Sequence, residues 1–122
     1  MFNYHGSCHC GDVEIVISKT SPIQNLTECN CSICQKKGIL HVAVQTNELN
    51  ILKGSNSLTM YQFGSNVAEH KFCKKCGIHI YGRPRSAPER LTVNIRCLVN
   101  FSQIISTAKV TKFDGQNHPK DQ

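Results

Sequence analysis

The chain has no tryptophan, few aromatic residues and no long apolar run. Its first residues, Met1-Phe2-Asn3-Tyr4-His5-Gly6, show no basic start followed by an apolar segment, so no secretory signal is predicted. No apolar stretch approaches the roughly 20 residues that a membrane-spanning helix needs. We therefore expect a cytoplasmic protein without a membrane segment.

The sequence also shows no internal repeat and no interdomain linker. Its 122 residues are enough for one small hydrophobic core. A hydrophobic fraction of 39% without tryptophan suits a compact domain that depends partly on bound metal for stability. We expect a single domain over residues 1–122, with a loose polar tail over residues 116–122.

Charge is in moderate positive excess, with a formal net charge of +6 and a pI of about 9.0. The basic residues are dispersed and form only small groups, such as Lys36-Lys37 and Lys74-Lys75. Aromatic residues, which stack on bases in many nucleic-acid-binding proteins, make up only 7% of the chain. A dedicated nucleic-acid surface is therefore not predicted.

The chain is rich in cysteine, with eight in 122 residues, and seven of the eight fall into three clusters. The clusters are a first pair, Cys8 and Cys10, a triplet, Cys29, Cys31 and Cys34, and a second pair, Cys73 and Cys76. In a reducing compartment, clustered cysteines are more often metal ligands than disulfides, and zinc is the metal we expect. Cys97 stands alone.

The number of cysteines suggests how they divide between two zinc ions. If the two pairs close on each other, they form one four-thiolate site, and the triplet is left with three ligands. Structural zinc normally has four protein ligands, whereas catalytic zinc keeps one position open, so the triplet favours chemistry. The sequence also permits a fourth ligand from His41, His70, His79 or another thiolate, which would make the triplet structural.

Short alternating segments separated by turn residues predict an all-β fold. Val13, Ile15 and Ile17 give the clearest alternation, within a strand expected over residues 12–18. Further strands are expected over residues 39–44, 51–52, 58–63, 78–81, 91–96 and 109–113. Residues 5–11 are expected to form a turn, residues 23–28 a connecting segment, and residues 35–38 and 102–106 brief helical turns.

The second cysteine pair predicts a zinc-binding hairpin. Gly77 follows Cys76 directly, and glycine there permits the backbone conformation that points amides at sulfur. Other candidates receive structural interpretations. Cys97 is expected to be a buried thiol, and His41 and His79 are expected to be satisfied residues within strands.

The order of these motifs resembles the glutathione-dependent formaldehyde-activating enzyme family, which includes the centromere protein V group and has the Mss4-like fold. The matching motifs are Gly6-Ser7-Cys8-His9-Cys10-Gly11, Cys29-x-Cys31-x-x-Cys34, Phe72-Cys73-x-x-Cys76-Gly77 and Asn94-Ile95-Arg96-Cys97-Leu98. The resemblance implies folded antiparallel sheets with zinc-binding hairpins. It also implies two Zn²⁺ per chain: a structural ion on Cys8, Cys10, Cys73 and Cys76, and a catalytic ion on Cys29, Cys31 and Cys34.

This chain departs from the family pattern at two positions. Asn30 stands where the family often has histidine, and His118 stands where it often has tryptophan. Asn30 is not a ligand in the family, so we expect metal binding to survive. These two departures instead leave open which substrate the protein takes.

The resemblance implies a carbon–sulfur lyase that acts on the adduct of a glutathione-like thiol and a small aldehyde, as S-hydroxymethylglutathione synthase does. A zinc ion with three thiolates is a weak Lewis acid but holds an external thiol well as its thiolate. Arg83, Arg85 and Arg96 are candidates to attract the carboxylates of such a substrate, although Arg83 and Arg85 are expected to be solvated surface residues instead. The alternative is a non-enzymatic zinc module that binds protein or nucleic acid, favoured by the basic balance and by Lys74-Lys75 at an exposed hairpin tip.

Overall fold

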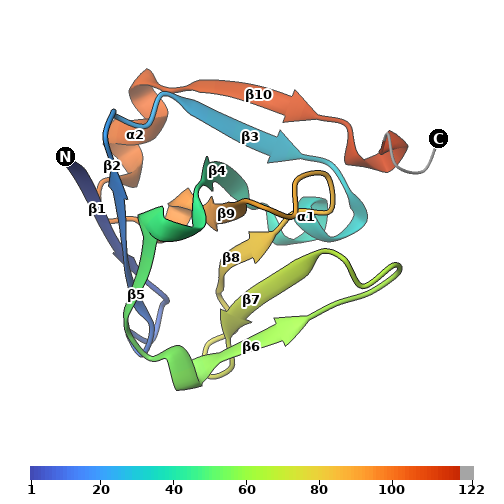
Figure 1. Cartoon of the computed structure of the whole chain (residues 1–122), viewed down its shortest axis with the longest axis horizontal. Helices are drawn as coiled ribbons and strands as arrows, with labels where there is room; N and C mark the ends of the chain where they lie inside the picture. Colours follow the sequence, from blue (N-terminus) through green and yellow to red (C-terminus); the bar gives the residue numbers. More distant parts are fainter. Residues whose placement is uncertain (119–122) are drawn as a thin grey trace.

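The protein, described over residues 1–118 by a computed structural model, contains two β-sheets flanked by short helices (Figure 1). The smaller sheet has the order β1-β2-β5 and consists of β1 (Phe2–Ser7), β2 (Glu14–Lys19) and β5 (Leu49–Lys53). The larger sheet has the order β10-β3-β4-β9-β8-β7-β6. Its strands are β3 (Asn25–Cys29), β4 (Leu40–Val44), β6 (Leu58–Tyr61), β7 (Glu69–Cys73), β8 (His79–Arg83), β9 (Leu91–Asn94) and β10 (Lys109–Phe113).

The helices are short and connect strands. The α-helices are α1 (Ser32–Lys37) and α2 (Phe101–Thr107), and the 3-10 helices are η1 (Thr46–Glu48), η2 (Ser55–Ser57), η3 (Ile95–Cys97) and η4 (Gly115–Asn117). Gly38 ends α1 in a left-handed conformation with φ of 67°, as its position after the triplet predicts. Among residues 1–118, no helix has both the length and the apolar character needed to pass through a bilayer.

The predicted all-β architecture is confirmed, and the alternating segments are strands. The segments expected over residues 12–18, 39–44 and 109–113 are β2, β4 and β10. All described strand pairs are antiparallel except β3 and β10, which run parallel. The strand expected over residues 91–96 stops at Asn94, because the Asn94 side chain accepts a hydrogen bond from the Arg96 N–H and starts η3.

Three strands were not predicted. Residues 5–7, expected to belong to a turn, are the last part of β1, which pairs along its whole length with β2. Residues 69–73, for which no strand was expected, form β7. Residues 25–29, expected as a connecting segment, form β3 between β4 and β10. Only Tyr4 and Gly6 are buried in β1 and only Leu26 in β3, so neither segment shows an apolar alternation long enough to recognise.

The expectation of a loose tail from Gln116 onward is wrong for the part that the structure describes. Gly115–Asn117 forms η4, and His118 is buried with its ring centroid 5.6 Å from that of Phe113. Residues 119–122 of the expected tail lie outside the described residues. The packed part of this segment matters because it reaches the cysteine triplet.

The hydrophobic core is one cluster to which both sheets contribute. Ile15 and Ile17 of β2, and Ile80 and Val93 of the larger sheet, are fully buried. Val42 pairs with Val93 on the core face, so the neighbouring His41 lies on the opposite face. The larger sheet therefore presents a polar face beside the metal centres.

Val93 provides a test of this core. We expect Val93→Ala to lower the free energy of unfolding by about 2 kcal/mol, because two fully buried methyl groups are lost. Urea denaturation of the metal-loaded protein at a fixed metal concentration measures the change. Val99→Ala is the matched control, since Val99 is 85% exposed, and its effect should stay within about 0.5 kcal/mol. Equal losses in the two variants would contradict the placement of Val93.

Candidate metal centres

The two cysteine pairs meet, although Cys10 and Cys73 are 63 positions apart in the chain. The sulfurs of Cys8, Cys10, Cys73 and Cys76 all lie within 4.8 Å of one another. Cys10 Sγ is 3.6 Å from Cys8 Sγ and 3.7 Å from Cys73 Sγ. A tetrahedral zinc–thiolate site with bonds of about 2.3 Å has edges of about 3.8 Å, so this donor set fits zinc.

Backbone turns shape the four-thiolate cluster. Gly11 and Gly77 each follow the second cysteine of a pair and have φ of 82° and 81°, which residues with a Cβ rarely adopt. The Val13 N–H donates a hydrogen bond to Cys8 Sγ at 3.3 Å. A hydrogen bond from the backbone of Cys10 lowers the pKa of Cys76 to about 6. Such amide contacts stabilise thiolates, the form that binds metal.

The triplet forms where β3 leads into α1. Cys29 ends β3, and Cys31 caps the N-terminus of α1 by accepting a hydrogen bond from the Cys34 N–H at 3.4 Å. The Cys31 N–H donates in turn to Cys29 Sγ, also at 3.4 Å. The three sulfurs lie within 4.8 Å of one another, a spacing that fits a shared metal ion.

The three thiols of the triplet strongly affect one another's ionisation. Side-chain hydrogen bonds with Cys29 and Cys34 lower the pKa of Cys31 to about 2. The corresponding interactions with Cys29 and Cys31 raise the pKa of Cys34. Thiolates this close repel one another, and a divalent cation would offset that repulsion and allow all three to ionise.

His41 lies beside the triplet but is not part of its ligand group. His41 Nε2 is 3.3 Å from Cys34 Sγ, yet the donor atoms that lie within 4.8 Å of one another come only from the three cysteines. His70 and His79 are outside the group as well. Among residues 1–118, the donor atoms grouped at the triplet are therefore its three sulfurs, and the division of the cysteines between two zinc ions stays a prediction.

The C-terminal segment packs directly on the triplet, a contact that the sequence did not reveal. Asn30 Nδ2 donates to Asp114 Oδ1 at 3.1 Å, and Asn30 Oδ1 accepts from the Gln116 N–H at 3.1 Å. Between these two contacts lies Gly115. A Cβ at Gly115 would lie 2.8 Å from Cys29 Sγ and 2.7 Å from Cys31 Cβ, so only glycine fits without displacing the triplet.

A cavity of about 620 Å³ lies beside the triplet and is within the usual range for small-molecule sites. It is lined by Glu28, Cys29, Asn30, Cys34, Gln35, Gly38, Ile39, Leu40, Arg96, Ile105, Val110 and Gln116. Two of the triplet sulfur-bearing residues therefore border it. Arg96, the one lining arginine, packs over the Phe101 ring with its guanidinium carbon 5.1 Å from the ring centroid.

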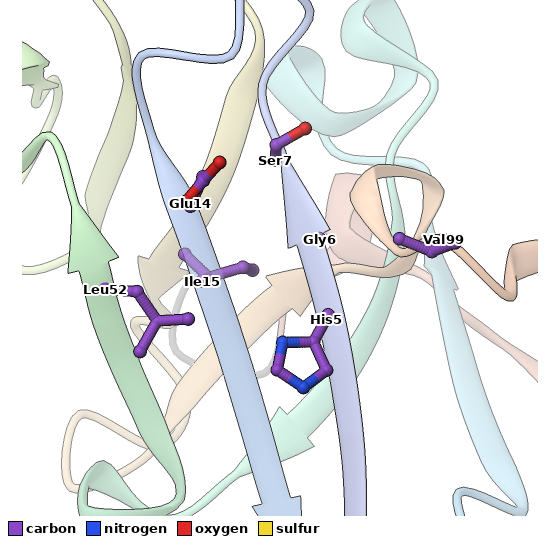
Figure 2. A pocket seen from close by; sticks show the side chains of 7 residues that line it. All are labelled: His5, Gly6, Ser7, Glu14, Ile15, Leu52 and Val99. Atoms are coloured by element: carbon purple, nitrogen blue, oxygen red, sulfur yellow. The ribbon is translucent and has the colours of Figure 1, made fainter.

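A smaller hollow of about 250 Å³ lies over the three-stranded sheet (Figure 2). Its lining residues come from β1, β2 and β5 and from the loop that carries Val99. No cysteine lines it, so it is separate from both metal centres.

The remaining candidates from the sequence have mixed outcomes. Cys97 is only partly buried, although a buried thiol was expected, and its burial still raises the pKa of Cys97 to about 12. His41 and His79 lie within strands and are buried, as expected, but each has one nitrogen without a hydrogen-bond partner in the described chain. The expectation that both are satisfied is therefore wrong. Arg83, a candidate for binding the substrate, has its Nε 3.7 Å from Glu69 Oε1 and does not line the cavity.

Three comparisons with known proteins agree with this geometry. A family model described as glutathione-dependent formaldehyde-activating enzyme matches residues 3–112. A protein from Emericella nidulans, named provisionally as such an enzyme, is 31% identical over 80 residues, which are 62% of this chain and 40% of the relative. The matched part thus spans less than half of that relative. A crystal structure of a Rhodobacter sphaeroides protein is 33% identical, with a TM-score of 0.78, over 88% of this chain and 99% of the other.

Gly115→Ala tests the contact between the C-terminal segment and the triplet. We expect zinc affinity at the triplet to fall about tenfold or more, because the added methyl group displaces Cys29 and Cys31. Competition with a chromogenic chelator would show one of two zinc ions becoming labile. Gly64→Ala is the control for backbone strain alone, since nothing lies within 4 Å of a Cβ there and its φ is 61°. Unchanged affinity in Gly115→Ala would contradict the contact.

Proposed function

The chain belongs to the glutathione-dependent formaldehyde-activating enzyme family, and from this premise we propose that it is a zinc-dependent carbon–sulfur lyase. Its substrate would be the adduct of a glutathione-like thiol and a small aldehyde, of the S-hydroxymethylglutathione type. One observation carries the proposal: the triplet sulfurs lie within 4.8 Å of one another, and two of the three cysteines, Cys29 and Cys34, border a cavity of about 620 Å³. A structural zinc site would not need such access.

The reaction requires a thiolate and a carbonyl carbon to meet. In the forward direction the thiol loses its proton, a sulfur–carbon bond forms, and the carbonyl oxygen takes up a proton to become the hydroxyl group. Cleavage reverses each step, so protons balance in both directions. Cys29, Cys31 and Cys34 would hold the zinc, which when bound supplies a position where an external thiol is kept as its thiolate.

The cavity supplies complementary groups for a small peptide thiol. Arg96 carries a permanent positive charge, which suits a carboxylate of the substrate. Glu28 exposes a carboxylate on the same cavity, which suits an ammonium group. Ile39, Ile105 and Val110 provide apolar wall between these polar groups. A glutathione-like molecule carries all three kinds of surface.

The non-enzymatic alternative depends mainly on the basic hairpin tip. Lys75 Nζ lies 2.6 Å from Asp12 Oδ2, so one of the two lysines there is locally neutralised. The triplet borders the cavity of about 620 Å³, whereas none of the four cysteines beside this tip lines that cavity or the smaller hollow. These observations favour the enzyme over a zinc module that only binds a partner.

Cys31→Ser is the decisive variant for the proposed lyase. We expect formation of the glutathione–formaldehyde adduct to fall about 100-fold or more, and bound zinc to fall from two ions per chain to one. Kinetics with formaldehyde and glutathione, together with metal analysis, measure both quantities. Cys97→Ser is the matched control, because Cys97 lies outside both clusters. Full activity in Cys31→Ser would refute the proposal.

Arg96→Gln separates substrate binding from chemistry. We expect KM for glutathione to rise about tenfold with little change in kcat, because a charge-assisted contact to a carboxylate is lost. With 2-mercaptoethanol, which has no carboxylate, the same variant should behave like the unchanged protein. The control is Arg90→Gln, an exposed arginine outside the cavity. A similar loss with both thiols would contradict the role of Arg96.

A further inference from the structure

Three buried imidazole nitrogens have no hydrogen-bond partner: His41 Nδ1, His70 Nε2 and His79 Nε2. Within residues 1–118, no other buried side-chain nitrogen or oxygen is in this condition. Buried polar atoms in folded proteins are almost always hydrogen-bonded, because leaving them unpaired is costly. Three such atoms in one cluster indicate a ligand that the chain itself does not supply.

The three histidines, His41, His70 and His79, form a cluster that lies next to the cysteine triplet, with His41 on the polar face of the larger sheet. The ring centroids of His41 and His79 are 6.4 Å apart, with the planes at 89°, and those of His79 and His70 are 6.1 Å apart. His41 is 8% exposed and His79 is 5% exposed, so both side chains are more than nine-tenths buried. Burial disfavours the charged form of each ring. A neutral imidazole has one N–H and one lone pair.

The second nitrogen of each ring fixes which atom carries the proton. Lys37 Nζ lies 3.4 Å from His79 Nδ1, and an ammonium group can only donate, so Nδ1 accepts and the proton is on Nε2. His41 Nε2 lies 3.3 Å from Cys34 Sγ, and a Cys34 thiolate held by zinc can only accept, so with zinc bound the His41 proton is on Nε2. In the zinc-loaded protein His79 therefore offers an unpaired donor, and His41 offers an unpaired acceptor.

We propose that His41 Nδ1 and His79 Nε2 form a binding site for one small hydroxyl compound, either water or the hydroxyl of a hydrated aldehyde. Its oxygen accepts from the His79 Nε2–H, and its own proton is donated to His41 Nδ1. Two such bonds of about 2.9 Å allow at most about 5.8 Å between the two nitrogens. Ring centroids 6.4 Å apart are compatible with this span where the two nitrogens lie on the facing edges of the rings. A bare cation or anion suits the site less, because one nitrogen donates and the other accepts.

A hydroxyl at this site completes a chain of hydrogen bonds that runs in one direction. The chain starts at Lys37, passes through His79, the hydroxyl and His41, and ends on Cys34 Sγ. A hydrogen bond to a metal-bound thiolate fixes its position and draws away part of its charge. His41 and His79 are thus positioning residues for Cys34. This role requires Cys34 to be a thiolate ligand but does not require the lyase reaction.

Nitrogen-15 NMR of the zinc-loaded protein, labelled at histidine, tests the assignment without measuring activity. At pH 7 both His41 and His79 should be neutral with the proton on Nε2. A proton on Nδ1 of either ring, or a charged ring, would overturn the proposal.

High-resolution crystals grown with and without formaldehyde identify the occupant. An oxygen bonded to both nitrogens in both crystals indicates water, and added carbon density after formaldehyde indicates the hydrated aldehyde. No oxygen in either crystal would refute the site.

His79→Phe tests whether the chain acts on Cys34. We expect zinc affinity at the triplet to fall about tenfold, with the four-thiolate cluster unaffected and partial recovery in His79→Gln, whose amide can both donate and accept. Chelator competition measures the affinity, and His5→Phe, at an exposed histidine outside the cluster, is the control. Wild-type affinity in a folded His79→Phe would contradict the role. If that variant does not fold, NMR of the native protein decides.

Discussion

Closure of the two cysteine pairs into one four-thiolate cluster is the constraint on which the rest of the structure depends. It joins the turn between β1 and β2 to the hairpin between β7 and β8, across 63 positions of chain from Cys10 to Cys73. A structural zinc ion contributes on the order of 10 kcal/mol in small metal-folded domains, comparable to the whole net stability of an ordinary domain. Because this closure uses both pairs, the three sulfurs of the triplet remain as a separate group of possible metal ligands.

Cys34 occupies a special position because it lies between two environments. On one side it borders the cavity that also contains Arg96, and on the other its sulfur contacts His41. The cavity side is accessible to a substrate, while the histidine side is buried. The helix α1 creates this arrangement, since it places Cys34 and Lys37 one turn apart and lets Lys37 reach His79. The contact of Cys34 with the cavity and its contact with His41 are thus separated in space.

Much of the fold and of the metal centres could be predicted from the sequence, for two physical reasons. Alternation such as Val13, Ile15 and Ile17 depends only on neighbouring residues, and the division of the cysteines depends only on how many ligands zinc takes. Strand β3 was missed because its place is fixed by pairing with β4 and β10 rather than by its own pattern. The contact of Asn30 with Gln116 spans 86 positions, so no local pattern signals it. The unpaired histidine nitrogens are equally invisible, because they result from packing between strands.

The two departures from the family pattern belong to one interface. Asn30 holds Asp114 and the Gln116 N–H with its two amide atoms, and His118 packs against Phe113 at the start of the same segment. An amide can donate and accept within a short distance, which suits a backbone that passes as closely as Gly115 does. Neither residue belongs to the group of sulfurs that would bind metal. However, Asn30 and Gln116 both line the cavity, so the departure at Asn30 bears on the shape of that cavity and not on the sulfur group.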